Sequence, residues 1–336
     1  MAAGIDEPVV LDVDDTIVAV HGHTKQGAGF GYAGVRGLNA LIATVSTPLA
    51  APVIVAQRLR KGACGSARGA ARLVADALAT LVRLRRPGVT GRVLLRADSA
   101  FYGQPTIAAA LRAGADVSVT VRLDPRVKAA IAAIDPQAWR PIAYTDAVYD
   151  EQTGRWISHA EIDFVAFSSR KKADRVPGRL VVRRLPDLNP KADPGQDSLF
   201  TVGRFHALFT TSDPNVVDTV TADKTHRGQA IIEQVHADLK NSALAHLPSG
   251  TFTANAGWLV LACLAFNLAR AAATLTGPRL AKATTVTIRR TLITVPARVA
   301  SSARRLTLHL PTAWPWQTAW NQLFTRACGP PLTAAA

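Results

Sequence analysis

LDVDDTIV, residues 11 to 18, is the stretch that decides the fold. Its aliphatic residues predict a buried β-strand, and the same pattern extends over residues 8–20. Three carboxylates interrupt it, those of Asp12, Asp14 and Asp15. Because successive side chains of a strand point to opposite faces, Asp12 and Asp14 share one face and Asp15 lies on the other. Buried acids need a compensating cation, either an Arg or Lys side chain or a metal ion.

Two interpretations of these acids are open. Hard divalent cations such as Mg²⁺ prefer oxygen ligands, so paired acids near the end of a strand suit a metal site. Alternatively, the strand ends at Val13 and the acids cap a turn. A further acid, Asp98 in RADSAFYG, follows the aliphatic run VLL. It would stand at the carboxyl end of another strand, where catalytic residues of open α/β sheets gather, unless it belongs to a solvated turn.

A third acidic candidate lies in HRGQAIIEQVHADLKNS, which predicts a helix from about Gly228. Glu233, His236 and Lys240 are three and four residues apart and therefore share one helix face. The opposite side carries an apolar stripe. Taken alone, the pattern also fits an ordinary solvent-exposed face.

The composition favours a polyanionic partner. The chain has 336 residues, 48% of them hydrophobic, enough for one large or two modest domains. Its net charge is +15, and nucleic acid is the first candidate because Lys and Arg contacts to phosphate drive such binding. Asp238 is the last acid, so residues 239–336 contain ten Lys or Arg and no Asp or Glu, which a merely solvated surface explains poorly. Over-use of Arg in a high-GC genome is the alternative.

Three cysteines without a CxxC pattern indicate neither a disulfide framework nor a zinc site, and they fit a reducing cytosol. The N-terminus shows no secretion signal. Residues 257–275 are strongly apolar, but Asn267 and Arg270 interrupt them, which favours a buried core helix over a membrane span. We therefore expect a cytoplasmic, nucleoid-associated bacterial protein with no membrane partner.

The order of predicted elements indicates an α/β fold. Strands are expected at 8–20, 35–59, 92–99 and 116–123, and helices at 65–86, 105–112, 228–244 and 254–276, with one more near the C-terminus. Residues 124–222 differ from their surroundings, with short β-prone pieces, many turns and a basic run that starts at Arg170. This pattern predicts an α/β core that is interrupted by a β-rich module.

LDVDDTIV resembles the DxDxT motif of the haloacid-dehalogenase phosphatases. That resemblance implies Asp12 as nucleophile and Asp14 as general acid/base. The family also needs a late acidic pair, and SAFYGQPT after Asp98 supplies no second acid.

A second resemblance covers nearly the whole chain. LDVDDTIVAVHGHTKQGAGFGYAGVRGLNAL, LRADSAFYG and HRGQAIIEQVHADLKN resemble three blocks of the DDE-type insertion-sequence transposases, most closely the group called insertion sequence thirteen-eighty. The resemblance implies a ribonuclease-H-like core with a mixed sheet, a β-rich insertion and a helical C-terminal end. The expected division is a first core part (1–123), the insertion (124–222), a second core part (223–276) and a basic helical region (277–336).

The same resemblance implies the catalytic residues. Asp14, Asp98 and Glu233 would hold two Mg²⁺ ions, or Mn²⁺ in their place, with Asp12 and Asp15 as alternates for the first acid.

The resemblance also implies contacts to DNA. Lys240 keeps the family's spacing from the Glu and would contact DNA phosphate, whereas Arg227 lies two residues further from Glu233 than the signature places its Arg. With Arg227, the basic residues Arg170, Lys171 and Lys172 complete the expected DNA contacts.

The resulting expectation is a DNA transposase that cleaves and transfers strands, binds insertion-sequence ends and target DNA, and forms a homodimer on DNA. Its first catalytic strand begins close to Met1, where family members carry a DNA-binding region, so we expect an N-terminally truncated copy. The alternatives are the phosphatase and an inactive DNA-binding remnant. GFGYAG (29–34) matches GxGxxG, but the sequence after it predicts a strand and not the helix of a dinucleotide site.

Overall fold

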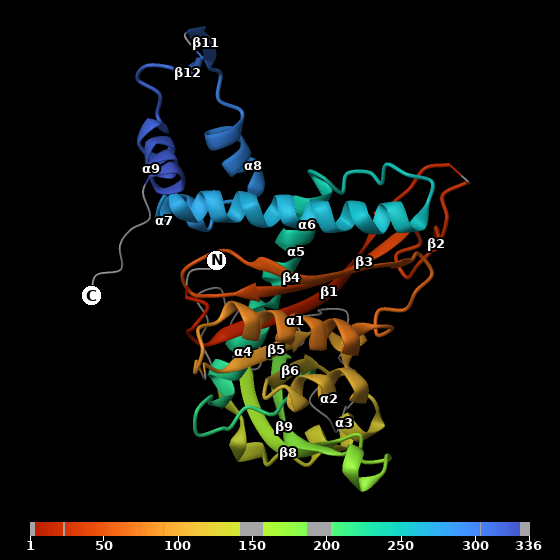
Figure 1. Cartoon of the computed structure of the whole chain (residues 1–336). Coiled ribbons are helices and arrows are strands. Elements are labelled where there is room, and N and C mark those ends of the chain that lie inside the picture. Colours follow the sequence, from red (N-terminus) through yellow and green to blue (C-terminus); the bar gives the residue numbers. More distant parts are fainter. Residues whose placement is uncertain are drawn as a thin grey trace.

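The computed structural model describes residues 4–22, 24–89, 91–141, 157–186, 203–302 and 304–329. A large mixed sheet forms the centre of the molecule, and helices cover both of its faces (Figure 1).

Five strands form the core of this sheet in the order β4-β3-β1-β5-β6. They are β1 (Val9–Ala19), β3 (Arg36–Ser46), β4 (Val53–Lys61), β5 (Val93–Ala97) and β6 (Asp116–Thr120). β1, β3 and β4 pair antiparallel, whereas β5 and β6 run parallel to β1, and the short β2 (Gly29–Phe30) pairs with β3. This arrangement is consistent with the expected ribonuclease-H-like core.

The acidic strand is continuous. β1 pairs with β3 from Val10 to Ala19, so the alternative that the strand ends at Val13 is wrong. Val9, Leu11 and Val13 are buried on the face under α1 (Ala70–Leu84) and α2 (Gln104–Arg112). Val18 packs on the opposite face with α5 (Ile231–Lys240) and α6 (Phe252–Leu275). The alternation of a two-sided buried strand is therefore confirmed.

The strands in the middle of the chain extend the core sheet. Beyond β6 the strand order is β10 (Gly203–Thr210), β9 (Val176–Pro186), β8 (Ser158–Ala166) and β7 (Arg140–Pro141). β10 pairs antiparallel with β6 and satisfies the backbone groups along its second edge. Residues 142–156 and 187–202 of the expected insertion lie outside the described residues.

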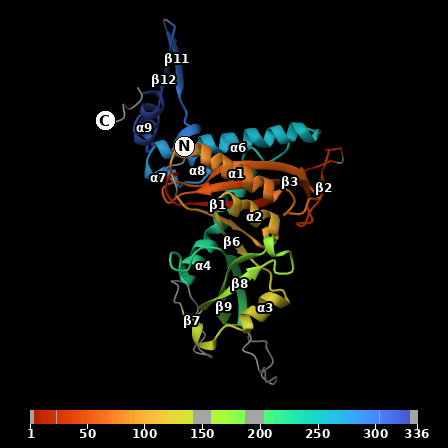
Figure 2. The same cartoon turned by 60° about the horizontal axis from the view of Figure 1, so that its bottom comes forward.

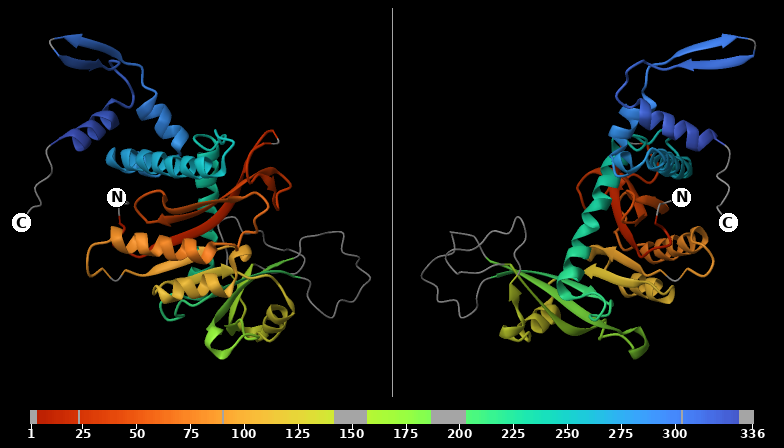
Figure 3. Two further views of the ribbon diagram at one scale, coloured as in Figure 1. Left: turned by 45° about the vertical axis from the view of Figure 1, so that its right-hand side comes forward. Right: turned by 90° about the vertical axis from the view of Figure 1, so that its left-hand side faces the viewer.

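The remaining described helical elements connect these strands and complete the C-terminal part. They are α3 (Pro125–Ala132), α4 (Thr219–Arg227), α7 (Pro278–Ala281), α8 (Thr285–Ile288), a π-helical turn η5 (Arg289–Ile293), α9 (Gln317–Cys328), and four short 3₁₀ turns, η1 (Ser99–Phe101), η2 (Pro136–Ala138), η3 (Lys172–Asp174) and η4 (Gly228–Ala230). The region from residue 277 is not wholly helical, because β11 (Arg298–Ser302) and β12 (Arg305–His309) form a hairpin. It projects away from the body of the molecule (Figures 2 and 3).

α6 lies across the sheet and is half-buried, although the sequence predicts a buried core helix. Leu259 and Phe266 pack inward, whereas Leu261, Leu264 and Leu268 are exposed. It is the one helix among the described residues that is long and apolar enough to cross a membrane. The Asn267 side chain accepts a hydrogen bond from the amide of Ile54 in β4 and donates one to its carbonyl.

A buried histidine joins α4 to the sheet. The His226 ring lies between the hydroxyls of Ser118 and Thr120 on β6, at 2.9 and 2.8 Å from its two nitrogens. Burial lowers the pKa of His226 to about 4, and the nearby charge of Arg96 adds to this effect. The ring is therefore neutral in the folded protein at physiological pH.

We predict that the folded state loses stability as the pH falls from about 6.5 to about 4. The unfolded chain protonates His226 first, because the folded pKa lies below the unfolded one, so stability that is present at neutral pH is lost on acidification, by at most about 3 kcal/mol. Urea unfolding at pH 7.5 and 4.5 measures this loss. His226→Gln should reduce the pH dependence, whereas the exposed His309→Gln should leave it unchanged.

Candidate active site

The parallel pairing of β1 with β5 brings Asp14 and Asp98 together. Val13 and Ala97 form the last pair of the register, and each acid is the next residue of its chain. Asp98 keeps an extended backbone, with φ −77° and ψ 179°. Since neighbouring strands are about 4.8 Å apart, the two carboxylates stand side by side at the carboxyl end of β5.

One step earlier in the same register, Asp12 faces Arg96. The Arg96 guanidinium donates two hydrogen bonds to the Asp12 carboxylate, at 2.7 and 2.8 Å. Asp12 is fully buried, and burial raises the pKa of Asp12 while Arg96 opposes that shift. Arg96 also donates to the carbonyl of Thr225 and lies against Gly228, where a Cβ atom would come within 2.5 Å of its Nη1. Asp12 is thus compensated by a protein cation.

Asp15 points to the other face of the sheet, as the strand alternation predicts. Arg60 of β4 forms an ion pair with its carboxylate. The Asn39 amide and the Ser66 hydroxyl donate hydrogen bonds to the same carboxylate, at 2.7 and 3.0 Å. Asp15 therefore links β1 to β3, to β4 and to the loop that follows β4.

The Asp14–Asp98 pair has no such partner. Among the described residues, no Arg or Lys forms an ion pair with either carboxylate. The backbone amide of Ala100 donates to Asp98 at 2.9 Å. Burial raises the pKa of Asp98, and the negative charge of Asp14 raises it further. The two carboxylates repel each other, and a bound cation would relieve this repulsion.

α5 packs against β1 and places a histidine beside this pair. His236 is buried, and its Nε2 lies 3.5 Å from Asp14 Oδ2. Neither ring nitrogen forms a hydrogen bond within the described part of the chain. Glu233 is exposed one helical turn earlier on the same side, and Lys240 is exposed two turns after Glu233. Of the three polar residues of the helix face, the structure places His236 against Asp14.

The two carboxylates suit a hard divalent cation, which takes oxygen ligands. Burial raises the pKa of Asp98, and the mutual repulsion of the two carboxylates, which raises it further, is the feature that fits such an ion. However, no group of three or more His, Cys, Asp or Glu side chains that could hold a metal ion occurs among the described residues. Asp14 and Asp98 are therefore available as metal ligands in this arrangement. Glu233 does not join them in a group of three.

A basic turn connects β8 to β9 and contacts the segment that follows Asp98. Arg170, Lys171 and Lys172 are exposed in the connection between β8 and β9. This connection contacts the segment that follows Asp98, because Tyr102 stacks on Phe167 with ring centroids 5.1 Å apart. Three of the predicted DNA-contacting residues thus lie in a connection that contacts the segment after Asp98.

The sequence interpretation missed both arginines that neutralise Asp12 and Asp15. A signal for Arg96 was present, since it precedes Asp98 by the same two residues by which Asp12 precedes Asp14. That equal offset has meaning only when the two strands are known to be parallel neighbours. No comparable signal connects Arg60 to Asp15.

The sequence matches one protein family, described as transposase DDE domain group 1, over residues 3–328. A comparison with curated proteins gives no match.

We predict opposite effects on stability for substitutions of Asp12 and Asp14. Asp12→Ala leaves the buried Arg96 charge uncompensated and should lower the free energy of unfolding by about 3–5 kcal/mol. Asp14→Asn removes one of two repelling charges and should leave stability unchanged or increased. Urea unfolding in EDTA measures both. An equal loss in the two variants would show that Asp14 is also a structural ion-pair partner.

Proposed function

The chain belongs to the transposase DDE domain group 1 family, and we propose that it cleaves and joins DNA strands at the edge of the sheet where Asp14 and Asp98 meet. One observation carries this proposal. Two carboxylates stand at the same level of neighbouring parallel strands without an Arg or Lys ion-pair partner among the described residues, while their neighbours Asp12 and Asp15 each have one.

In this proposal Asp14, Asp98 and Glu233 hold Mg²⁺, or Mn²⁺ in its place. Two such ions, when bound, would activate the attacking hydroxyl and stabilise the leaving 3′ oxygen of an in-line phosphodiester displacement. Asp14 is the first acid because Asp12 and Asp15 are already engaged by Arg96 and Arg60.

The residues around the acid pair have separate tasks. The buried ring of His236 lies beside the Asp14 carboxylate, with 3.5 Å between Nε2 and Oδ2, and limits its movement. Arg96 opposes the effect of burial on the pKa of Asp12, and its two hydrogen bonds to that carboxylate link β5 to β1 behind the reacting groups. Asp98 is held by the backbone amide of Ala100, which fixes the direction of its carboxylate.

DNA is the proposed partner, both as insertion-sequence ends and as target, with two copies of the chain assembled on it in the cytoplasm. Lys240, Arg227 and the turn of Arg170, Lys171 and Lys172 are proposed to bind its phosphates. All five are exposed, and the turn adjoins the segment after Asp98. Assignment to the insertion sequence thirteen-eighty group rests on the three sequence blocks.

Nothing in the structure favours the phosphatase alternative. Its nucleophile would be Asp12, which is fully buried and bound by Arg96. The inactive remnant differs from the enzyme only in activity, so a direct assay separates the two.

We expect the protein to nick supercoiled plasmid that carries its own element ends, in Mg²⁺ or Mn²⁺. Asp14→Asn, Asp98→Asn and Glu233→Gln should each lower the rate by roughly 100-fold or more, because loss of even an outer partner of a metal ligand costs about 10- to 100-fold. Asp163→Asn, an exposed acid on β8, is the matched control and should retain full activity.

Equal nicking by the parent and Asp98→Asn would remove Asp98 from the active site. No nicking by the parent would indicate the remnant, and hydrolysis of a small phosphomonoester that depends on Asp12 would establish the phosphatase.

We also expect Mg²⁺ to stabilise the folded protein in the absence of DNA, because the cation relieves the repulsion between Asp14 and Asp98. At a concentration 100 times the dissociation constant the gain should be about 2.7 kcal/mol. Thermal unfolding with Mg²⁺ and with EDTA measures it. The gain should vanish in Asp98→Asn and persist in Asp163→Asn, and an equal gain in both variants would place the ion elsewhere.

A further inference from the structure

A cavity lies along the part of β1 that follows Asp14. β5 pairs with this edge of β1 only as far as Val13, and no other described strand pairs with it beyond that point. A cavity of about 580 Å³ follows the open edge, and Thr16 and Ala19 of β1 and Lys240 of α5 are among its lining residues. The open stretch from Asp14 to Ala19 measures roughly 17 Å, at about 3.3 Å per residue, which is long enough for a few nucleotides.

Two exposed aromatic side chains also line this cavity. Phe30 is 67% exposed, and Tyr32 is completely exposed. The glycine between them allows the backbones to approach closely, since a Cβ atom on Gly31 would lie 2.7 Å from the carbonyl oxygen of Gly62. The GxGxxG match at 29–34 is thus explained by packing, and β3 follows it where a dinucleotide site needs a helix.

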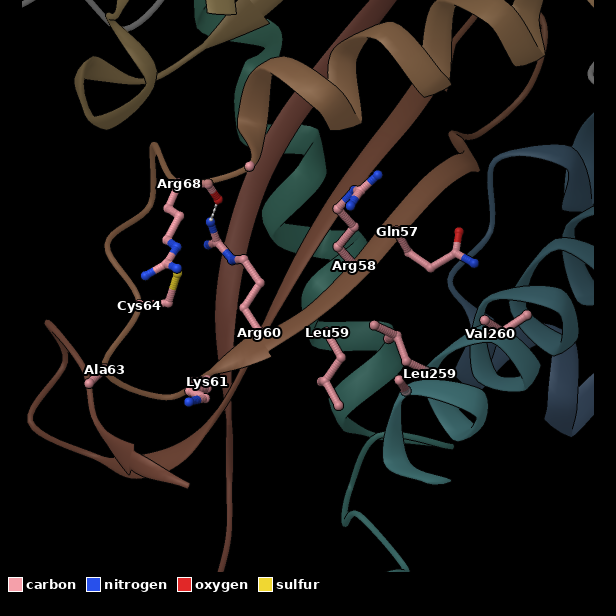
Figure 4. Close-up of a pocket in the computed structure, with 12 residues that line it drawn as sticks. Gln57, Arg58, Leu59, Arg60, Lys61, Ala63, Cys64, Arg68, Leu259 and Val260 are labelled. Atoms are coloured by element: carbon pink, nitrogen blue, oxygen red, sulfur yellow. Dashed lines mark hydrogen bonds between the residues drawn. The ribbon is translucent and has the colours of Figure 1, made fainter. Parts of the chain in front are cut away.

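A second cavity, of about 650 Å³, adjoins the first. The Ala63–Cys64 segment after β4 lines both, and Figure 4 shows the second cavity with its labelled residues. Lys61 and Arg68 line it, and neither side chain has a hydrogen bond or ion pair within the described part of the chain. No acid is among its lining residues, so this cavity is positively charged.

We propose that the two cavities form one groove that binds an unpaired DNA strand beside the active site. Bases of that strand stack on Phe30 and Tyr32, and its phosphates contact Lys240, Lys61 and Arg68. Aromatic faces together with a positively charged groove are the combination that holds single strands without sequence preference. This inference rests on the proposed function, because the strand would be one that the acid pair cuts or joins.

An unpaired strand fits better than a duplex. Base pairing and stacking hide the faces of the bases in a duplex, whereas an unpaired base can lie flat against Phe30 or Tyr32. Bases can therefore stack on the two exposed rings only when they are unpaired.

Binding of a fluorescently labelled single-stranded oligonucleotide in EDTA tests the aromatic contacts without catalysis. Phe30→Ala and Tyr32→Ala should each weaken binding by about 5- to 100-fold, because stacking on one aromatic side chain has that effect. Tyr32→Trp should retain affinity, since it keeps an aromatic face. Phe324→Ala, an exposed aromatic on α9, is the matched control and should bind like the parent.

The salt dependence of the same binding tests the charged contacts. Lys61→Gln and Arg68→Gln should each reduce the slope of log K against log salt concentration by about 0.7, the value for one phosphate contact to a single strand. Tyr32→Ala should lower affinity without changing this slope.

The native cysteines report where the strand lies. Cys64 lines both cavities and is partly exposed, whereas Cys328 is exposed at the end of α9. Single-stranded oligonucleotide should slow the alkylation of Cys64 and leave that of Cys328 unchanged. Equal rates at Cys64 with and without the oligonucleotide would overturn the groove.

Unchanged affinity of both Phe30→Ala and Tyr32→Ala would also overturn it. A shift of oligomeric state in these variants at unchanged affinity would mark the rings as an interface between copies and exclude the groove. These measurements need no metal and no cleavage. Failure of the groove with Asp98-dependent nicking intact would refute this inference alone, and failure of nicking with the groove intact would refute only the proposed function.

Discussion

The parallel pairing of β1 with β5 is the constraint on which the rest of the site depends. The register pairs Asp12 with Arg96 and ends with Val13 and Ala97, and Asp14 and Asp98 are the residues that follow this last pair. A shift by one residue would turn all of these side chains to the opposite face and separate the acids from α5. The buried ion pair of Asp12 and Arg96 is sensitive to such a shift, because a buried charge without its partner is strongly destabilising. The Asp12–Arg96 ion pair therefore fixes the alignment of Asp14 with Asp98.

The two pairs differ in charge: one is an ion pair and the other consists of two acids. Asp12 and Arg96 neutralise each other inside the protein, and their geometry leaves no ligand position open. Asp14 and Asp98 stand where β5 ends and repel each other. In the proposed function, this pair of carboxylates is in place before a divalent ion binds.

The surroundings of the acid pair match a polyanionic partner in both charge and shape. Exposed basic groups occur in the β8–β9 turn, at Lys240 on α5 and at Arg68 in the loop after β4. The long acid-free C-terminal part adds a projecting hairpin with Arg298 and Arg305 on its strands (Figure 3). Positive charge attracts the phosphates of DNA. It therefore raises the local concentration of DNA near the carboxyl end of β5.

The sequence by itself determined the two-sided acidic strand, the core helices and strands, and the three acidic blocks, because hydrophobic periodicity and motif residues are local properties. It could not determine which of Asp12, Asp14 and Asp15 remains without a cationic partner, since Arg96 and Arg60 approach only through strand pairing. It likewise gave no sign that β10 extends the core sheet or that Phe30 and Tyr32 face the cavity beside Lys240. These features depend on contacts between residues distant in the chain, and only the tertiary structure decides such contacts.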